Sequence, residues 1–151
     1  MGRRTQEGET LEQYKQRMID PISESYCAAK WYNATIWLGH GQTASCHHPP
    51  GHWIPLEELK DNYTAIHNTK HKKLMRKYMQ EGKRPAECEY CWKVEDMGKN
   101  HVSDRTFKTE IFKDEDIHKS AEMPWDENVM LRTLEISFDR ACNFCLLYTS
   151  D

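Results

Sequence analysis

The chain has 151 residues, of which 38% are hydrophobic and 30% are charged, and its formal net charge is -3. This length suits one domain, or one small domain with part of a second. The low hydrophobic content predicts a small core, of the kind that often needs a bound metal for stability. The slightly negative charge argues against a nucleic-acid partner that is recognised by bulk charge.

The sequence shows no signal peptide and no membrane-spanning pattern. The N-terminal stretch MGRRTQEGETLEQYKQRM lacks an apolar core, and a run of about 18 apolar residues occurs nowhere. We therefore expect a cytoplasmic protein without a membrane partner. In that reducing compartment, six cysteines favour metal ligands or free thiols over disulfides.

The first element predicted is a short helix. Thr10 and Gln13 have the spacing of a capping box, and apolar residues follow at helical spacing. Pro21 disfavours helical backbone in the residue before it, so the helix is expected over 10–20.

A β-hairpin is predicted next. Residues 30–38 (KWYNATIWL) are rich in aromatic and β-branched side chains, the GHG that follows supplies a turn, and 42–46 (QTASC) resume an extended pattern. Cys27 stands just before this hairpin and Cys46 at its far end.

Helical segments are predicted in the middle of the chain. LEELK after Pro55 can form a short helix, and Asn68 can cap a longer one that Gly82 ends. We expect the basic run at 70–77 (KHKKLMRK) to be the solvated face of that helix, opposite an apolar face. CEYCWKVEDMG, from Cys88, can form another one or two turns.

The C-terminal part predicts a linker and a strand. Residues 113–130 are acidic, contain a proline and show no clean period, which is typical of a linker. LRTLEISF at 131–138 is typical of a strand, which we expect to lack neighbours in this chain and so to expose its edges.

Four cysteines form two separated pairs: Cys27 and Cys46 at the ends of the hairpin, and Cys88 and Cys91 in a CxxC. Four thiolates so arranged suit a tetrahedral metal or an iron–sulfur cluster. Thiolates are soft ligands, so zinc and iron–sulfur clusters are favoured over calcium or magnesium. The alternatives are that these are small buried hydrophobes, or that the CxxC is a thioredoxin-like redox pair; the latter lacks its βαβ context.

At this point a resemblance becomes specific. CAAKWYNATIWLGHGQTASC, followed at a distance by CEYC, resembles the auxiliary-cluster module of radical S-adenosylmethionine (radical SAM) proteins, in the short "twitch" form related to the SPASM domain. Cys27, Gly41, Cys46, Cys88 and Cys91 match the family signature, and the likeness covers about residues 25 to 100. The resemblance implies that the four cysteines hold one 4Fe-4S cluster.

The C-terminal strand carries a second resemblance. LEISFDRACNF is similar to the first strand and cluster loop of a radical SAM core, and Cys142 matches a ligand of its catalytic cluster. In such enzymes the cluster reductively cleaves S-adenosylmethionine to a 5′-deoxyadenosyl radical. Cys145 follows Cys142 after two residues where the family has three, and the tail CLLYTSD resembles translated sequencing-adapter sequence. The resemblance therefore implies an N-terminal fragment, inactive alone, whose longer parent is an enzyme.

The predicted fold is α+β, with a hairpin and short helices around a four-cysteine site in 1–112, a linker over 113–130, and the start of an incomplete (β/α) radical SAM barrel over 131–151. The substrate of the parent is expected to be a peptide, a protein or a small metabolite, with nucleic acid disfavoured. The alternative function is a structural zinc-binding module that mediates protein or nucleic-acid interaction.

The remaining aromatic residues and histidines have simpler interpretations. We expect Trp31 or Trp37, together with Trp92, to pack around the cluster and exclude water. His47 and His48 could replace a thiolate in a zinc site, but they are read as loop residues. The histidines interpreted as surface residues are His52, His67, His71, His101 and His118.

Overall fold

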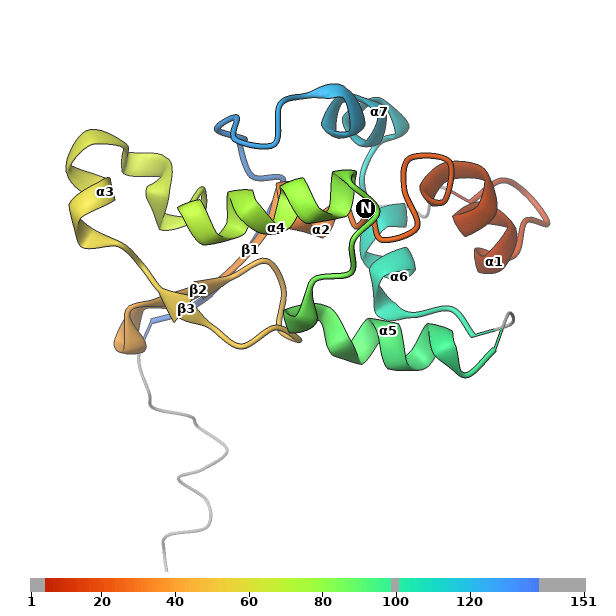
Figure 1. Ribbon diagram of the computed structural model, residues 1–151, viewed down its shortest axis with the longest axis horizontal. Coiled ribbons are helices and arrows are strands. Elements are labelled where there is room, and N and C mark those ends of the chain that lie inside the picture. The colour runs from red at the N-terminus through yellow and green to blue at the C-terminus, as the bar shows by residue number, and fades with distance from the viewer. Residues whose placement is uncertain (1–4, 99–100, 139–151) are drawn as a thin grey trace, which may run out of the picture.

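The computed structural model describes residues 5–98 and 101–138, which form a mixed α+β fold with a small sheet at one end and helices over the rest (Figure 1). The strands are β1 (Asn33–Trp37), β2 (Gln42–Ala44), β3 (His52–Trp53) and β4 (Thr133–Ser137). The helices are α1 (Leu11–Tyr14), the π-helical η1 (Lys15–Ile19), α2 (Ala29–Tyr32), α3 (Leu56–Asp61), α4 (Lys70–Gln80), α5 (Glu89–Asp96), α6 (Asp104–Glu110) and α7 (Asp114–Glu122), with 3-10 turns η2 (Leu38–His40), η3 (Tyr63–Ile66) and η4 (Ala86–Cys88).

The N-terminal helix begins where its cap predicts. The backbone N–H of Gln13 donates to Thr10 Oγ1 at 3.2 Å, and the backbone N–H of Thr10 donates to Gln13 Oε1 at 2.8 Å. This capping box satisfies two backbone groups of the first turn. The helix then widens into the π-helical η1, which buries Met18 and Ile19.

The hairpin forms, but its first strand starts later than predicted. Lys30, Trp31 and Tyr32 were expected in the strand, whereas they belong to the helical turn α2 and are buried. The turn ends at Gly41, whose φ of 65° is the left-handed conformation that a glycine adopts without steric cost. β1 and β2 are antiparallel, with Ile36 opposite Thr43.

Helix α4 occupies the predicted range, with a different cap. The side chain of Thr69, rather than that of Asn68, accepts from the backbone N–H of Lys72 at 3.0 Å. Asn68 instead bonds the chain before β4: its Nδ2 donates to Val129 O at 3.1 Å, and its Oδ1 accepts from Val129 N at 3.2 Å.

The solvated basic face predicted for this helix is wrong in part. Lys72 and Arg76 are fully buried. Lys72 Nζ donates to Asn33 O at 2.5 Å, and the Arg76 guanidinium donates to Lys30 O and to the side chain of Asn68. These two cations therefore tie α4 to α2 and β1 by satisfying backbone carbonyls.

The range 113–130, predicted as a linker, contains a packed helix. Ile117 of α7 has no exposed surface and belongs to the main core. Ser120, one turn later, bonds Tyr26 Oη at 2.5 Å. The acidic residues that suggested a linker instead occupy the first turn of α7, where negative charge stabilises a helix.

Strand β4 has a neighbour, contrary to expectation. It pairs in parallel with β1, with Thr35 opposite Glu135, and the sheet order is β3-β2-β1-β4. Asn33 Oδ1 accepts from Thr133 Oγ1 at 2.6 Å, which fixes this register at its start. Among the described residues β4 is one of the two edge strands of the sheet, so only its outer side keeps the exposure that was predicted.

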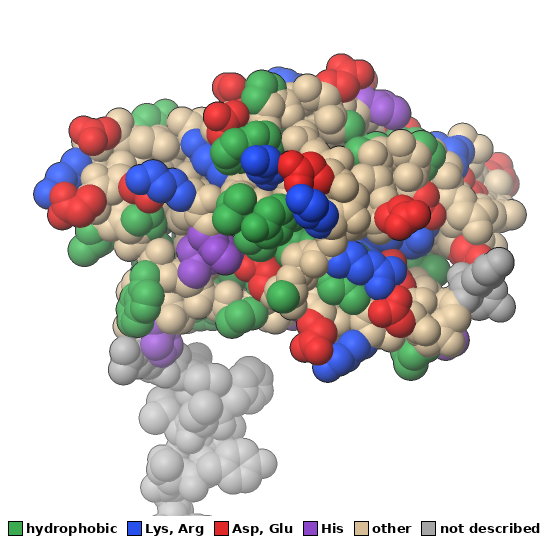
Figure 2. All heavy atoms as spheres, in the orientation of Figure 1, with side chains coloured by type: hydrophobic (Ala, Val, Ile, Leu, Met, Phe, Trp, Pro, Cys, Tyr) green, Lys and Arg blue, Asp and Glu red, His purple; other side chains and the backbone are tan. Residues whose placement is uncertain are grey.

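The main hydrophobic core lies among the helices and the segments that connect them. Its members come from the N-terminal helix, α2, α4, α5 and α7, and include Trp31, Tyr32, Met79, Trp92 and Ile117. Between positions 5–98 and 101–138, no helix is both long enough and apolar enough to cross a membrane. On the face shown in Figure 2, acidic and basic side chains are interspersed, without a large field of one sign.

Candidate metal centre

All four cysteines predicted as ligands line one pocket. Cys27 lies just before α2, Cys46 follows β2, Cys88 ends η4, and Cys91 lies in the first turn of α5. Three segments that are far apart in the sequence therefore meet here.

Local structure explains each pair. Antiparallel pairing of β1 and β2 returns the chain towards the start of the hairpin, where Asn33 Nδ2 donates to Ser45 O at 2.7 Å. This bond holds the residue before Cys46 close to the end of α2. Cys88 and Cys91 are three residues apart across the junction of η4 and α5, a spacing that places two side chains on one face of a helix.

The four thiols are free. None of Cys27, Cys46, Cys88 and Cys91 is in a disulfide. Across 5–98 and 101–138, the one group of three or more possible ligand atoms within 4.8 Å of one another is His47, His48 and Asp104, so no three of these sulfurs meet that limit. A tetrahedral zinc ion with Zn–S of about 2.3 Å would hold its sulfurs about 3.8 Å apart.

Burial keeps these thiols protonated in the absence of a metal. It raises the pKa of Cys27 to about 12 and that of Cys91 to about 11. It raises the pKa values of Cys46 and Cys88 as well. A bound metal would reverse this, because thiolates are the ligands and metal binding releases their protons.

Polar groups beside three of the thiols oppose this effect of burial. Against the effect of burial, the backbone of His48 lowers the pKa of Cys46 by a hydrogen bond, and the backbone of Arg105 does the same for Cys91. The ammonium group of Lys30 acts in the same way on Cys88. Such donors stabilise thiolates and tune the metal that they hold, so the donor set fits a thiolate-bound metal or cluster.

An ion pair that the sequence did not suggest lies beside the pocket, and one member of it, Lys30, lines the pocket. The ammonium group of Lys30, whose side chain is 2% exposed, lies 2.5 Å from Glu87 Oε1. His71 Nε2 lies 2.5 Å from the other oxygen, Oε2. Lys30 was read as a strand residue, and nothing local in KWYN indicates that its side chain turns inwards.

Trp92 packs beside the site as predicted. It lines the pocket, and its Nε1 donates to Pro85 O at 2.7 Å. The guanidinium group of Arg105 lies 5.5 Å from its ring centroid. Trp31 and Trp37 do not line this pocket; Trp31 packs on Tyr26 in the core, with ring centroids 5.2 Å apart.

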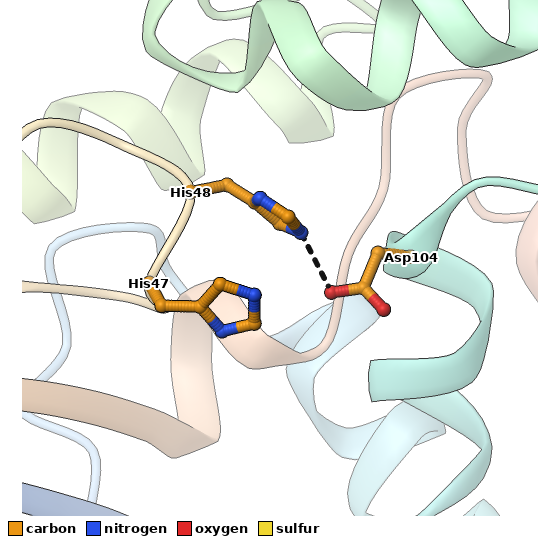
Figure 3. Close-up of side chains that lie close together, drawn as sticks. All are labelled: His47, His48 and Asp104. Atoms are coloured by element: carbon orange, nitrogen blue, oxygen red, sulfur yellow. Dashed lines mark hydrogen bonds and ion pairs between the residues drawn. The ribbon is translucent and has the colours of Figure 1, made fainter. Parts of the chain in front are cut away.

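His47, His48 and Asp104 lie close together (Figure 3), and His48 and Asp104 also line the pocket. His48 Nε2 bonds Asp104 Oδ2 at 2.9 Å, and the His48 ring stacks on Tyr90 at 4.0 Å. The ammonium group of Lys108 is 3.9 Å from the same Asp104 oxygen. Hydrogen bonding, stacking and an ion pair thus account for His48 and Asp104 without a metal.

The surface assignment of histidines is wrong for His67, which is 6% exposed. Its Nε2 donates to Val129 O at 2.8 Å, so it helps to hold the chain before β4. His52 is half-buried, and its Nε2 bonds Thr69 Oγ1 at 2.7 Å.

The predicted ligand Cys142 lies outside the described residues, as does Cys145. Comparison of the chain with protein-family models, with curated proteins and with solved structures found no match. The site is therefore interpreted from its own residues.

Proposed function

We propose that the chain binds one 4Fe-4S cluster through Cys27, Cys46, Cys88 and Cys91, and that it is the N-terminal part of a radical SAM protein. The observation that carries the first part is the convergence of four free thiols, from three distant segments, on one pocket. Chance rarely brings together every cysteine of a predicted ligand set.

Four thiolates suit either a cluster or a single zinc ion, and the resemblance of the cysteine pattern to the auxiliary-cluster module favours the cluster. The apolar wall formed by Trp92 and Met79 suits a cofactor that is shielded from water.

In the longer parent, a cluster of this kind would supply electron transfer or substrate binding close to the radical chemistry. This chain's own residues would hold it: four thiolates as ligands, the amides of His48 and Arg105 as hydrogen-bond donors, and Trp92 as a barrier to water. The parent's S-adenosylmethionine cleavage, its peptide, protein or small-metabolite substrate, and a cytoplasmic location belong to the same proposal.

The test is elemental analysis and electron paramagnetic resonance of protein purified and reconstituted without oxygen. We expect about four irons per chain and a cluster signal after reduction, as a 4Fe-4S cluster requires. Cys88→Ala should lose most of the iron, while Cys142→Ala, outside this pocket's ligand set, should retain it. Full iron retention in Cys88→Ala would refute the ligand assignment.

The second candidate function is the structural zinc module, which the four-thiol donor set also allows. One zinc per chain and no iron after the same reconstitution would favour it.

A further inference from the structure

A row of charged groups runs from the cysteine pocket to the surface. Lys30 lines the pocket, its Nζ lies 2.5 Å from Glu87 Oε1, and His71 Nε2 lies 2.5 Å from Glu87 Oε2. The side chain of Lys30 is 2% exposed and that of His71 is 43% exposed, so the row begins in the interior and ends in solvent. Glu87 is next to Cys88 in the sequence, which fixes the pair against the CxxC.

A buried ion pair rarely stabilises a fold more than apolar side chains of the same size would. Lys30 is buried and lines the pocket beside Trp92 and Met79, where an uncharged side chain would be buried at lower cost. Its cation is therefore best explained by negative charge inside the pocket, which four thiolates would provide.

The other cations at the pocket are less available to it. Arg105 donates Nε and Nη2 to the two oxygens of Glu95, at 2.6 and 2.9 Å, so its charge has a dedicated partner. Lys108 is 19% exposed and is drawn to Asp104. Lys30 differs, because the carboxylate that pairs with it, that of Glu87, is shared with His71 on the solvent side.

We propose that Lys30 sets the reduction potential of the cluster in this pocket, because its buried ammonium group stabilises the negative charge that reduction adds. The proposal rests on the proposed function. Reduction transfers one electron from a low-potential one-electron donor to the cluster and breaks no bond. The added charge is stabilised by a nearby cation, and the low dielectric of the pocket strengthens that attraction.

The experiment is a redox titration of the reconstituted protein, monitored by electron paramagnetic resonance, with iron content measured on each sample. We expect Lys30→Met to weaken the equilibrium for one-electron reduction about tenfold, which lowers the midpoint potential by about 59 mV. Glu87→Gln removes the opposing charge and should raise the potential. Lys30→Arg keeps the charge, so its midpoint potential should stay near that of the unmutated chain.

Lys93→Met is the matched control for net charge. Lys93 lies on α5, the helix of Cys91, but its side chain is 71% exposed and pairs with Glu89. Solvent screens such a charge, so its removal should leave the potential unchanged.

Opposite shifts for Lys30→Met and Glu87→Gln identify charge as the cause, because disruption of the fold would not change sign between them. An unchanged potential in an iron-loaded Lys30→Met protein overturns the inference and leaves the cluster proposal standing. If Lys30→Met fails to hold iron, Glu87→Gln decides, and an unchanged potential there overturns the inference. If the unmutated chain binds no iron, the cluster proposal itself is wrong, and this inference with it.

Discussion

Arg105 and Glu95 form a bidentate ion pair beside the cysteine pocket, with Nε 2.6 Å from Oε1 and Nη2 2.9 Å from Oε2. Both side chains are buried, at 2% and 8% exposure. Arg105 Nη1 also donates to Tyr26 O at 2.7 Å. The pair thus joins α5, α6 and the segment that carries Cys27, and it connects the stability of the fold to the shape of the site.

Loss of this pair should be costly. Arg105→Met leaves Glu95 buried without its counter-ion, so we expect the free energy of unfolding to fall by about 3 kcal/mol. Urea denaturation of the unmutated chain and of the variant, in the same metal state, measures this loss of free energy. Lys93→Ala, which breaks the exposed pair with Glu89, should cost less than about 1 kcal/mol; equal losses in the two variants would contradict the role given to Arg105.

His67 should make the fold sensitive to mild acid. Burial lowers its pKa from the ordinary 6.5 to about 4, so the unfolded chain binds a proton in a pH range where the folded chain does not. Stability should therefore fall as pH drops from 6.5 towards 4, by about 2 kcal/mol from this residue. In the variant His67→Gln, the side-chain amide can still donate to Val129 O but does not titrate.

Denaturation midpoints at pH 7 and 4.5 test this. Between these two pH values, the unmutated chain should lose more stability than the His67→Gln variant does. The same loss in both proteins would assign the acid sensitivity to other groups.

Asn68 should be essential to the anchoring of the chain before β4. Its amide bonds the N–H and C=O of Val129, and its Oδ1 also accepts from Arg76 Nη2 at 2.9 Å. Asn68→Ala leaves these buried groups without partners, so we expect a loss of about 2 kcal/mol or more in urea denaturation. Asn62, which is partly exposed, caps the 3-10 turn η3, and Asn62→Ala should lower the free energy of unfolding by about 1 kcal/mol. A smaller loss at position 68 than at 62 would show that this anchor is dispensable.

The thiols should react unequally in the metal-free protein. Cys27 is buried with a pKa of about 12, whereas Cys46 is only half-buried. Because the thiolate is the reactive form, alkylation of Cys27 by iodoacetamide at pH 8 should be at least about tenfold slower than alkylation of Cys46. Mass spectrometry of the peptides at timed intervals gives both rates, and metal loading should protect both thiols. Equal rates in the metal-free protein would mean that the pocket is open.

Removal of the metal should loosen the fold. The pocket brings together four thiols, of which Cys27 and Cys91 are buried and Cys46 and Cys88 are half-buried. A structural metal contributes on the order of 10 kcal/mol in small domains. Circular dichroism before and after chelation should show loss of helical signal and a lower melting temperature. An unchanged melt would exclude a structural role for any bound metal.

The sequence alone determined the local elements and singled out the four cysteines that line the candidate site. Capping by Thr10 and Gln13, the turn at Gly41 and the helical range of α4 all follow from interactions within a few residues, and the structure has each of them. The two cysteine pairs were evident for the same reason, because turn and helix spacing bring each pair together locally.

Only the tertiary structure decided how these pieces meet. The joining of the hairpin to the CxxC, the parallel pairing of β4 with β1, and the burial of Lys30 and Lys72 depend on contacts between residues dozens of positions apart. A lysine is read from sequence as a solvated charge, since burying it is costly without a partner. Its partners here, Glu87 and the carbonyl of Asn33, come from other elements, so the burial of these two cations became visible only when the chain was packed.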